Sequence, residues 1–311
     1  MISYRWCPEL DAADLAQVTA LIGAAAEYDA EAGFSTIDAS VPGQRSRGAV
    51  RVAHLPIRAR RDLSMRADAP WVTVAYLNLR VDPDGLGTVR FVVHPDYRSR
   101  GVATLLVEEL GLEVAVPGGW CGTGARRLRA WAYGTHPATE RLAARFGIAA
   151  VDRRWTLVRH LSGPWAVPLG AVDVGIEIPG SRSADGWGGA AEFAAAVLPD
   201  TLAAASVPGP GRVIAVGDAR GPVGLVRFDA GTTPYAEFRG AWIRAAAVAP
   251  RAGRRGIGSA LLTRALGEMR DAGAQVALIR VDPADERAVR TLRLLSFEQE
   301  ETHTLFGVSE T

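Results

Sequence analysis

The sequence contains no lysine, and all 35 of its basic residues are arginines. This absence excludes mechanisms that need a lysine amine, such as a Schiff base with a carbonyl substrate or the lysine of a P-loop. With 34 acidic residues, the formal net charge is only +1. Dedicated nucleic-acid-binding proteins concentrate positive charge, so we expect no nucleic-acid partner.

Cysteine and long apolar runs are also scarce. Cys7 and Cys121 are the only cysteines, too few for a disulfide framework. With the five histidines, they show no metal-ligand spacing. No apolar run approaches the ~20 residues of a membrane helix, and residues 1–6 lack the charged-then-apolar pattern of a signal peptide. We therefore expect a cytoplasmic protein with reduced thiols, no metal and no membrane contact.

One loop pattern occurs twice. Residues 94–103 and 248–258 are basic and glycine-containing, and each lies between an apolar strand and a helix with apolar residues at helical spacing. Pro95 matches Pro250 and Gly101 matches Gly256, and both pairs are 155 residues apart. Since no gap is needed to align the two loops, the repeat indicates a duplicated domain.

The length of 311 residues and the hydrophobic content of 48% also suit two packed domains. A segment rich in proline and glycine separates the repeats. We predict an N-terminal domain at 1–161, a linker at 162–172 and a C-terminal domain at 173–311. The second is expected to begin with a strand at 174–178 and a helix at 186–197, and to end with a strand at 300–307.

The order of strands and helices predicts the α/β class, with a mixed central sheet flanked by helices in each domain. The strand before each loop and the strand after the following helix form a βαβ crossover, so these two strands should be parallel. Their other neighbours should be antiparallel. Each loop then opens a helix, where free backbone N–H groups and the helix dipole favour a phosphate.

The pattern Arg98-x-x-Gly101-x-Ala103 resembles the acetyl-CoA signature of the GNAT N-acetyltransferases, Arg/Gln-x-x-Gly-x-Gly/Ala. The order of elements around it is also similar, so the resemblance covers nearly the whole chain as two tandem GNAT domains. Among tandem members the chain most resembles the mycothiol synthases, through Trp131–Thr135 and through Ala75–Leu79.

The resemblance implies acetyl-CoA as the cofactor, with its pyrophosphate on the loop N–H groups and its pantetheine arm beside the preceding strand. A strand N–H can then stabilise the oxyanion when the thioester is attacked. The implied cofactor-binding residues are Phe91, Val92, Val93, Arg98, Ser99, Arg100, Gly101, Val102 and Ala103 in the first domain, and Ala246, Ala247, Val248, Gly253, Arg254, Arg255, Gly256, Ile257, Gly258 and Ser259 in the second.

The sequence also departs from the family pattern. Gly253 stands in the place of the first Arg/Gln, so the first loop is expected to be the better cofactor site. The tyrosine that commonly protonates the departing thiolate falls at Ala143 and Leu292, which cannot donate a proton. A strand glutamate serves the substrate amine in mycothiol synthases, and Trp242 aligns with it here.

The sequence assigns no catalytic residue by the family pattern and offers two candidates. An amine must lose a proton to become a nucleophile, so a base is needed near the acetyl group. Glu237 lies just ahead of the second domain's central strand, either as a base or as a solvated charge at a strand end. Tyr133 lies at the end of the strand at 127–133, either reaching the thiolate or packing.

The sequence thus predicts an acetyl-CoA-dependent N-acetyltransferase that acts on the amine of a small polar molecule, as a monomer or homodimer. One alternative is a non-catalytic or half-catalytic acetyl-CoA-binding sensor or scaffold. Another is a protein or peptide acetyltransferase. The pattern does not identify the acceptor amine or the domain that performs the transfer.

Overall fold

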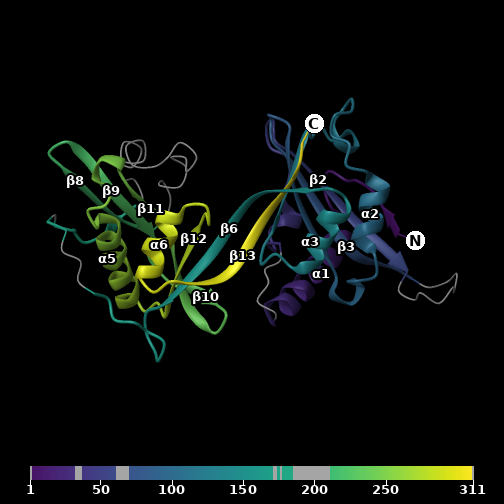
Figure 1. The fold of residues 1–311 in the computed structure, drawn as a ribbon. Helices are drawn as coiled ribbons and strands as arrows, with labels where there is room; N and C mark the ends of the chain where they lie inside the picture. The colour runs from purple at the N-terminus through teal and green to yellow at the C-terminus, as the bar shows by residue number, and fades with distance from the viewer. Residues whose placement is uncertain are drawn as a thin grey trace. The chain divides into compact units, whose positions relative to one another are not determined.

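The computed structural model describes residues 2–31, 37–60, 70–170, 174–175, 177–184 and 211–309 (Figure 1). The chain forms two compact units. The first contains Met1–Arg153 and Glu301–Thr311, and the second contains Arg154–Glu300. Each unit therefore includes part of the chain that the sequence assigns to the other domain.

The first unit is built on a sheet with the strand order β1-β2-β3-β4-β5-β13. The strands are β1 (Ile2–Tyr4), β2 (Arg51–Arg60), β3 (Trp71–Val81), β4 (Leu86–Val93), β5 (Arg127–Ala132) and β13 (Glu298–Val308). The helices are α1 (Ala12–Glu31), α2 (Val102–Leu110) and α3 (Pro137–Arg145), with short 3₁₀ turns η1 (Val41–Gly43), η2 (Pro95–Tyr97) and η3 (Trp120–Gly122).

Helices cover both faces of this sheet. Leu77 and Leu79 of β3 pack with α2 in one core cluster, whereas Tyr76 packs with α1 in another. Because both faces are covered, β3 is buried at almost every position from Thr73 to Val81, and strict alternation of polar and apolar residues is absent. Helix α1 begins where the Asp11 carboxylate accepts the Asp14 N–H at 2.8 Å.

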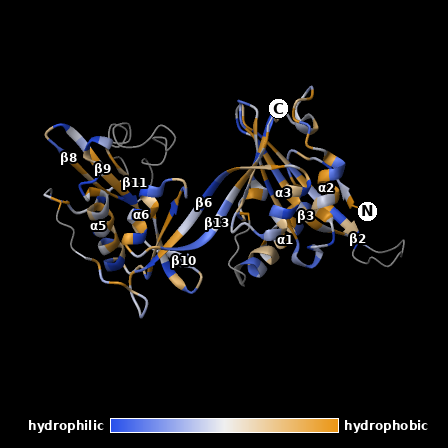
Figure 2. Ribbon diagram, in the orientation of Figure 1, coloured by the Kyte–Doolittle hydropathy of each residue, from blue (hydrophilic) through white to orange (hydrophobic). Residues whose placement is uncertain are grey.

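The second unit has the strand order β6-β12-β11-β9-β8-β7. The strands are β6 (Ala149–His160), β7 (Arg182–Ser183), β8 (Arg212–Asp218), β9 (Gly221–Phe228), β10 (Thr233–Tyr235), β11 (Phe238–Val248) and β12 (Val276–Val281). The short strand β10 pairs with β11. The helical segments are η6 (Pro250–Ala252), α5 (Ile257–Asp271) and α6 (Glu286–Leu294). Residues of α5 and α6 share one core cluster with the sheet, and Figure 2 shows the hydrophobic colouring of these strands.

The predicted parallel pairs are confirmed. β4 runs parallel to β5, and β11 runs parallel to β12. β4 is antiparallel to β3, and β11 is antiparallel to β9. Each unit is therefore the mixed α/β sheet with flanking helices that the sequence predicts.

The strands that close the two sheets differ from the prediction of contiguous domains. β6 was expected to complete the first domain, but its residues Trp155–His160 pair with β12 of the second unit. β13 was expected to complete the second domain, but its residues Thr304–Val308 pair with β5 of the first unit. In Figure 1 the yellow C-terminal strand accordingly ends among the purple and blue strands.

The reason is that hydrophobic patterning identifies a strand without naming the strand it pairs with. Where β6 and β13 pass from one unit to the other, they are hydrophilic, as Asp152–Arg154 and Glu298–Glu301 show (Figure 2). Two elements were expected at the start of the second domain, a strand at 174–178 and a helix at 186–197. The described residues among 174–178 form no strand, and the helix expected at 186–197 lies outside the described residues.

Ending the chain at Glu300 tests the exchange of strands. We expect the first unit to lose about 3 kcal/mol or more, because several ladder hydrogen bonds of about 1 kcal/mol each are lost with β13. Hydrogen exchange should quicken at residues 127–132 and stay slow at 276–281. A chain that lacks only residues 310–311 is the control. Faster hydrogen exchange confined to the second unit would contradict the pairing of β13 with β5 and would support contiguous domains.

Candidate functional site

Each unit contains two parallel strands that separate partway along their length. β4 and β5 pair from Leu86–Arg127 to Val89–Ala130. β11 and β12 pair from Gly240–Val276 to Ile243–Ile279. In the part of the chain that the structure describes, neither ladder continues beyond these four pairs, so the strands diverge toward the ends that carry the glycine-containing loops. We call each opening a wedge.

The wedges are lined by backbone groups of β4 and β11 that lie beyond the described ladders with β5 and β12. The His94 N–H bonds the Val74 carbonyl at 2.8 Å, and the Ala249 N–H bonds the Val223 carbonyl at 2.7 Å. Hydrogen-bonded positions alternate along an antiparallel strand. The N–H and C=O groups of Phe91 and Val93 therefore face the first wedge. By the same alternation, those of Ala246 and Val248 face the second, so each wedge offers a free strand edge to an extended ligand.

The two turns that follow have nearly identical backbones. Arg98 has φ −65° and ψ 155°, and Gly253 has −61° and 154°. Ser99 and Arg254, the next residues, are both left-handed with φ of 59° and 66°. This conformation is uncommon for residues other than glycine, and it persists where the surroundings enforce it.

The turns end at glycines that open helices. Gly101 and Gly256 have φ of 78° and 75°. The first helical bonds run from the Leu105 N–H to Gly101 and from the Ala260 N–H to Gly256. The N–H groups of residues 102–104 and 257–259 therefore have no partner within their helices. Together with the helix dipole, they form two cradles suited to a phosphate.

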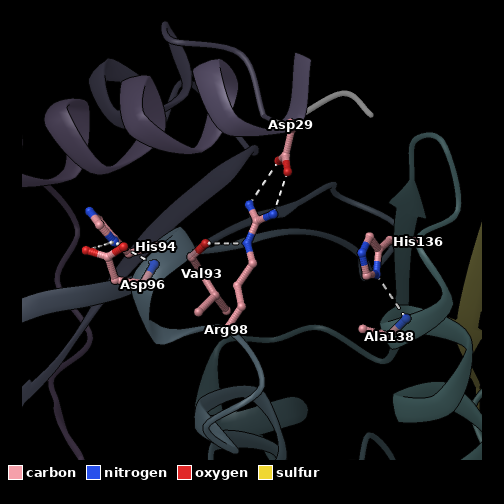
Figure 3. A network of polar contacts seen from close by, with 7 residues as sticks. All are labelled: Asp29, Val93, His94, Asp96, Arg98, His136 and Ala138. Carbon is pink, nitrogen blue, oxygen red and sulfur yellow. Dashed lines mark hydrogen bonds and ion pairs between the residues drawn. The ribbon is translucent and has the colours of Figure 1, made fainter. Parts of the chain in front are cut away.

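The Arg98 side chain is held by partners within the first unit. Its guanidinium forms two hydrogen bonds with the Asp29 carboxylate of α1, at 2.5 and 3.0 Å, and its Nε donates to the Val93 carbonyl at 3.2 Å (Figure 3). Its backbone N–H bonds the Pro95 carbonyl. The side chain also lies 5.2 Å from the Tyr28 ring centre. Arg98 therefore fixes the first turn to α1, and the free N–H groups begin at Ser99.

The charge on the two loops is unequal. In the first loop, Arg98 is neutralised by Asp29, and Arg100 lies over the Tyr97 ring at 5.3 Å. In the second loop, Arg254 and Arg255 are exposed, and within the described residues neither forms an ion pair. Net positive charge therefore favours the second loop, the reverse of the expectation from the completeness of the signature.

The two catalytic candidates lie in different settings. Glu237 is exposed in the tight turn between β10 and β11, where Tyr235 pairs with Phe238. It precedes Ala246 by nine residues, so roughly 30 Å of strand separates it from the second wedge. Tyr133 directly follows β5, at the open end of the first wedge. The structure thus brings Tyr133, but not Glu237, to a wedge.

Tyr133 has a neighbour that the sequence did not reveal. His303 of β13 is 1% exposed, and its ring lies edge-to-face with Tyr133 at 5.6 Å. Its Nδ1 accepts the Gly134 N–H at 3.0 Å, which assigns the proton to Nε2, 3.3 Å from the Glu301 carboxylate. No pattern could indicate this contact, because 169 residues separate Gly134 from His303.

Trp242 occupies a cationic part of the second unit. The Arg244 and Arg280 guanidinium groups lie 5.5 and 5.2 Å from its ring centre. A β-bulge between Ile243 and Ala245 aims Arg244 at this point, and Arg244 pairs with Asp229 through two hydrogen bonds of 2.8 Å. The aligned position therefore presents an aromatic surface flanked by arginines.

The two histidines near the first wedge have structural roles. His94 and His136 each accept an N–H at the start of a helical segment, from Asp96 at 3.3 Å and from Ala138 at 3.0 Å (Figure 3). Burial raises the pKa of both cysteine thiols, so neither is a thiolate at neutral pH. Ala143 and Leu292 are buried, at 5% and 2% exposure.

Neither a membrane helix nor a metal-ligand cluster is present in the described ranges. None of the helices in those ranges is long and apolar enough to cross a membrane. Nowhere in them do three His, Cys, Asp or Glu side chains gather as metal ligands would.

Replacing Asp29 by asparagine tests the attachment of the first turn to α1. We expect the free energy of unfolding to fall by about 1–3 kcal/mol, because the partly buried Arg98 loses its counter-charge. Hydrogen exchange at residues 94–104 should quicken. The control is Asp96→Asn, whose carboxylate is 81% exposed and 3.9 Å from His94. Equal effects of the two variants would contradict the attachment.

Comparison with known proteins agrees with this geometry. The sequence profile of the Acetyltransferase (GNAT) family matches residues 189–297. Mycothiol acetyltransferase of Saccharomonospora viridis is 35% identical over 149 residues, which are 48% of this chain and 42% of that relative. Mycothiol acetyltransferase of Sanguibacter keddieii is 28% identical over 93% of this chain and 91% of its own length.

Solved structures show the same fold over the whole chain. A tandem GNAT protein from the clavulanic acid biosynthesis pathway has a TM-score of 0.62 and 14% identity, covering 99% of this chain and 98% of that one. A GCN5-related N-acetyltransferase from Sphaerobacter thermophilus has a TM-score of 0.61 and 18% identity, covering 99% and 95%. Residues 189–297 therefore match the GNAT acetyltransferase family, and the chain is similar over nearly its whole length to mycothiol acetyltransferases and, in fold, to a tandem GNAT protein.

Proposed function

We propose that the chain transfers the acetyl group of acetyl-CoA to the amine of a small polar molecule. The observation that carries the proposal is the wedge followed by a glycine turn, which occurs once in each unit with the same backbone angles. The relatives named mycothiol acetyltransferase support a small-molecule acceptor.

The residues present fit acetyl-CoA, which supplies an activated acetyl thioester. The N–H groups of residues 99–104 and 254–259 would bind the pyrophosphate. The wedge-facing backbone groups of Phe91, Ala246 and Val248, and the Val93 N–H, would hold the pantetheine arm by strand-like hydrogen bonds. An N–H of the same edge would stabilise negative charge on the carbonyl oxygen during attack.

Proton transfer is assigned on position. The amine must lose a proton, and the departing thiolate must receive a proton from a donor. Tyr133 lies at the open end of the first wedge and is 37% exposed, so we assign it the donor role in the first unit. Trp242 cannot act as a base, so we infer that the acceptor differs from that of the mycothiol acetyltransferases.

A second function is favoured by one observation. The positions where the family commonly carries a proton-donating tyrosine are Ala143 and Leu292, and both are buried. One or both units would then bind acetyl-CoA without turnover, as a sensor or scaffold.

A matched pair of substitutions tests the cofactor sites. Ala103→Asp and Gly258→Asp place a carboxylate in the first turn of α2 and α5, which suits the helix dipole but repels a phosphate. A Cβ at Gly258 would make only an ordinary contact of 3.4 Å with Val248. Each variant should weaken acetyl-CoA binding at its own site by about 2 kcal/mol, or roughly 30-fold.

Calorimetric titration provides the measurement. We expect two sites of wild-type affinity in the wild type, one in each variant and none in the double variant, whose two sites bind roughly 30-fold more weakly, with unchanged thermal stability. A wild type that binds no acetyl-CoA would refute the proposed function. Two sites of wild-type affinity in the double variant would refute the assignment to these loops.

Release of free CoA thiol across a panel of small amines tests turnover. We expect release with at least one amine, and a fall in kcat of about 100-fold for Tyr133→Phe, because general acid catalysis commonly contributes that much. KM for acetyl-CoA should change little. Binding without thiol release for any amine would favour the sensor.

A further inference from the structure

The second loop lacks the arginine that begins the signature in the first loop, yet it keeps the same backbone. Gly253 has φ −61° and ψ 154°, which any residue can adopt. Conformation therefore does not require glycine here. The absence of a side chain does, however, leave space beside the backbone.

The guanidinium of Arg287 fills that space. A Cβ atom built on Gly253 would lie 2.5 Å from Arg287 Nη2, 3.1 Å from Nη1 and 3.2 Å from Cζ. Arg287 belongs to the first turn of α6, and 34 residues separate it from Gly253. A side chain at position 253 would have to displace this guanidinium, so Gly253 and Arg287 are complementary.

Arg287 also differs from Arg98 in its charge partners. Arg98 is bound to the Asp29 carboxylate. Arg287 is exposed, and within the described residues its side chain forms no hydrogen bond or ion pair. The nearby Asp285 carboxylate accepts the Ala288 N–H at 2.9 Å as the cap of α6. The second turn is therefore flanked by a cation whose hydrogen-bond donors are unused.

We propose that Arg287 is a phosphate-binding residue of the second acetyl-CoA site, where its guanidinium contacts the pyrophosphate held by the N–H groups of residues 254–259. The inference rests on the proposed function. A planar guanidinium with free donors suits two phosphate oxygens at once. Helix α6 thus adds a cation to the second site beside those of the loop itself.

The test uses the full chain carrying Ala103→Asp, so that the second site alone binds acetyl-CoA. In this background, Arg287→Ala should weaken binding at least tenfold by calorimetry, and Arg287→Lys should retain part of the affinity because the charge remains. Dephospho-CoA should show the same loss, since it keeps the pyrophosphate. The control is Arg290→Ala, an exposed arginine on the same helix, which should leave the affinity unchanged.

The outcomes separate this inference from the function on which it rests. If Arg287→Ala binds as tightly as its background while Gly258→Asp abolishes binding, Arg287 is no phosphate contact and the acetyl-CoA site stands. A loss seen with acetyl-CoA but absent with dephospho-CoA would also overturn the inference, because it would place Arg287 at the 3′-phosphate. A background that binds nothing, beside a wild type that binds once, would overturn it by leaving only the first site.

Discussion

The separation of two parallel strands is the constraint on which the rest of each unit depends. Where β4 runs beside β5, and β11 beside β12, the backbone N–H and C=O groups of each pair form hydrogen bonds with one another. Where they part, those groups need another partner, because unpaired backbone groups are costly once water is excluded. The following turn then directs a second set of free N–H groups to the same end of the sheet. An extended ligand with an anionic group satisfies both sets together.

Electrostatics distinguishes the two otherwise similar sites. In the first, Arg98 bonds to Asp29 and to Val93, so its charge stabilises the turn and is compensated before any ligand arrives. In the second, Arg254, Arg255 and Arg287 are not compensated by ion pairs in the described part of the chain. The duplicated sites thus share a backbone and differ in how much positive charge they offer to a phosphate.

Much of the fold and part of the site followed from the sequence. Pro95, Gly101 and their partners 155 residues later predicted both turns, and the crossover rule predicted both parallel pairs. What failed depends on contacts between distant residues. The hydrogen bond of Arg98 to Asp29 spans 69 residues. Gly253 departs from the signature, and the sequence does not show that the Arg287 guanidinium lies beside it. Glu237 was correctly expected just before a strand, but the length of that strand removes it from the wedge.

The exchange of β6 and β13 has a consequence for the order in which the protein can mature. A chain leaves the ribosome from its N-terminus, and domains commonly fold as they emerge. Here the first unit holds the N-terminal 153 residues but pairs its strand β5 with Thr304–Val308. Its sheet can be completed only after Thr304–Val308 have been synthesised. The first unit therefore finishes folding only after residues 154–300 of the second unit have also been made.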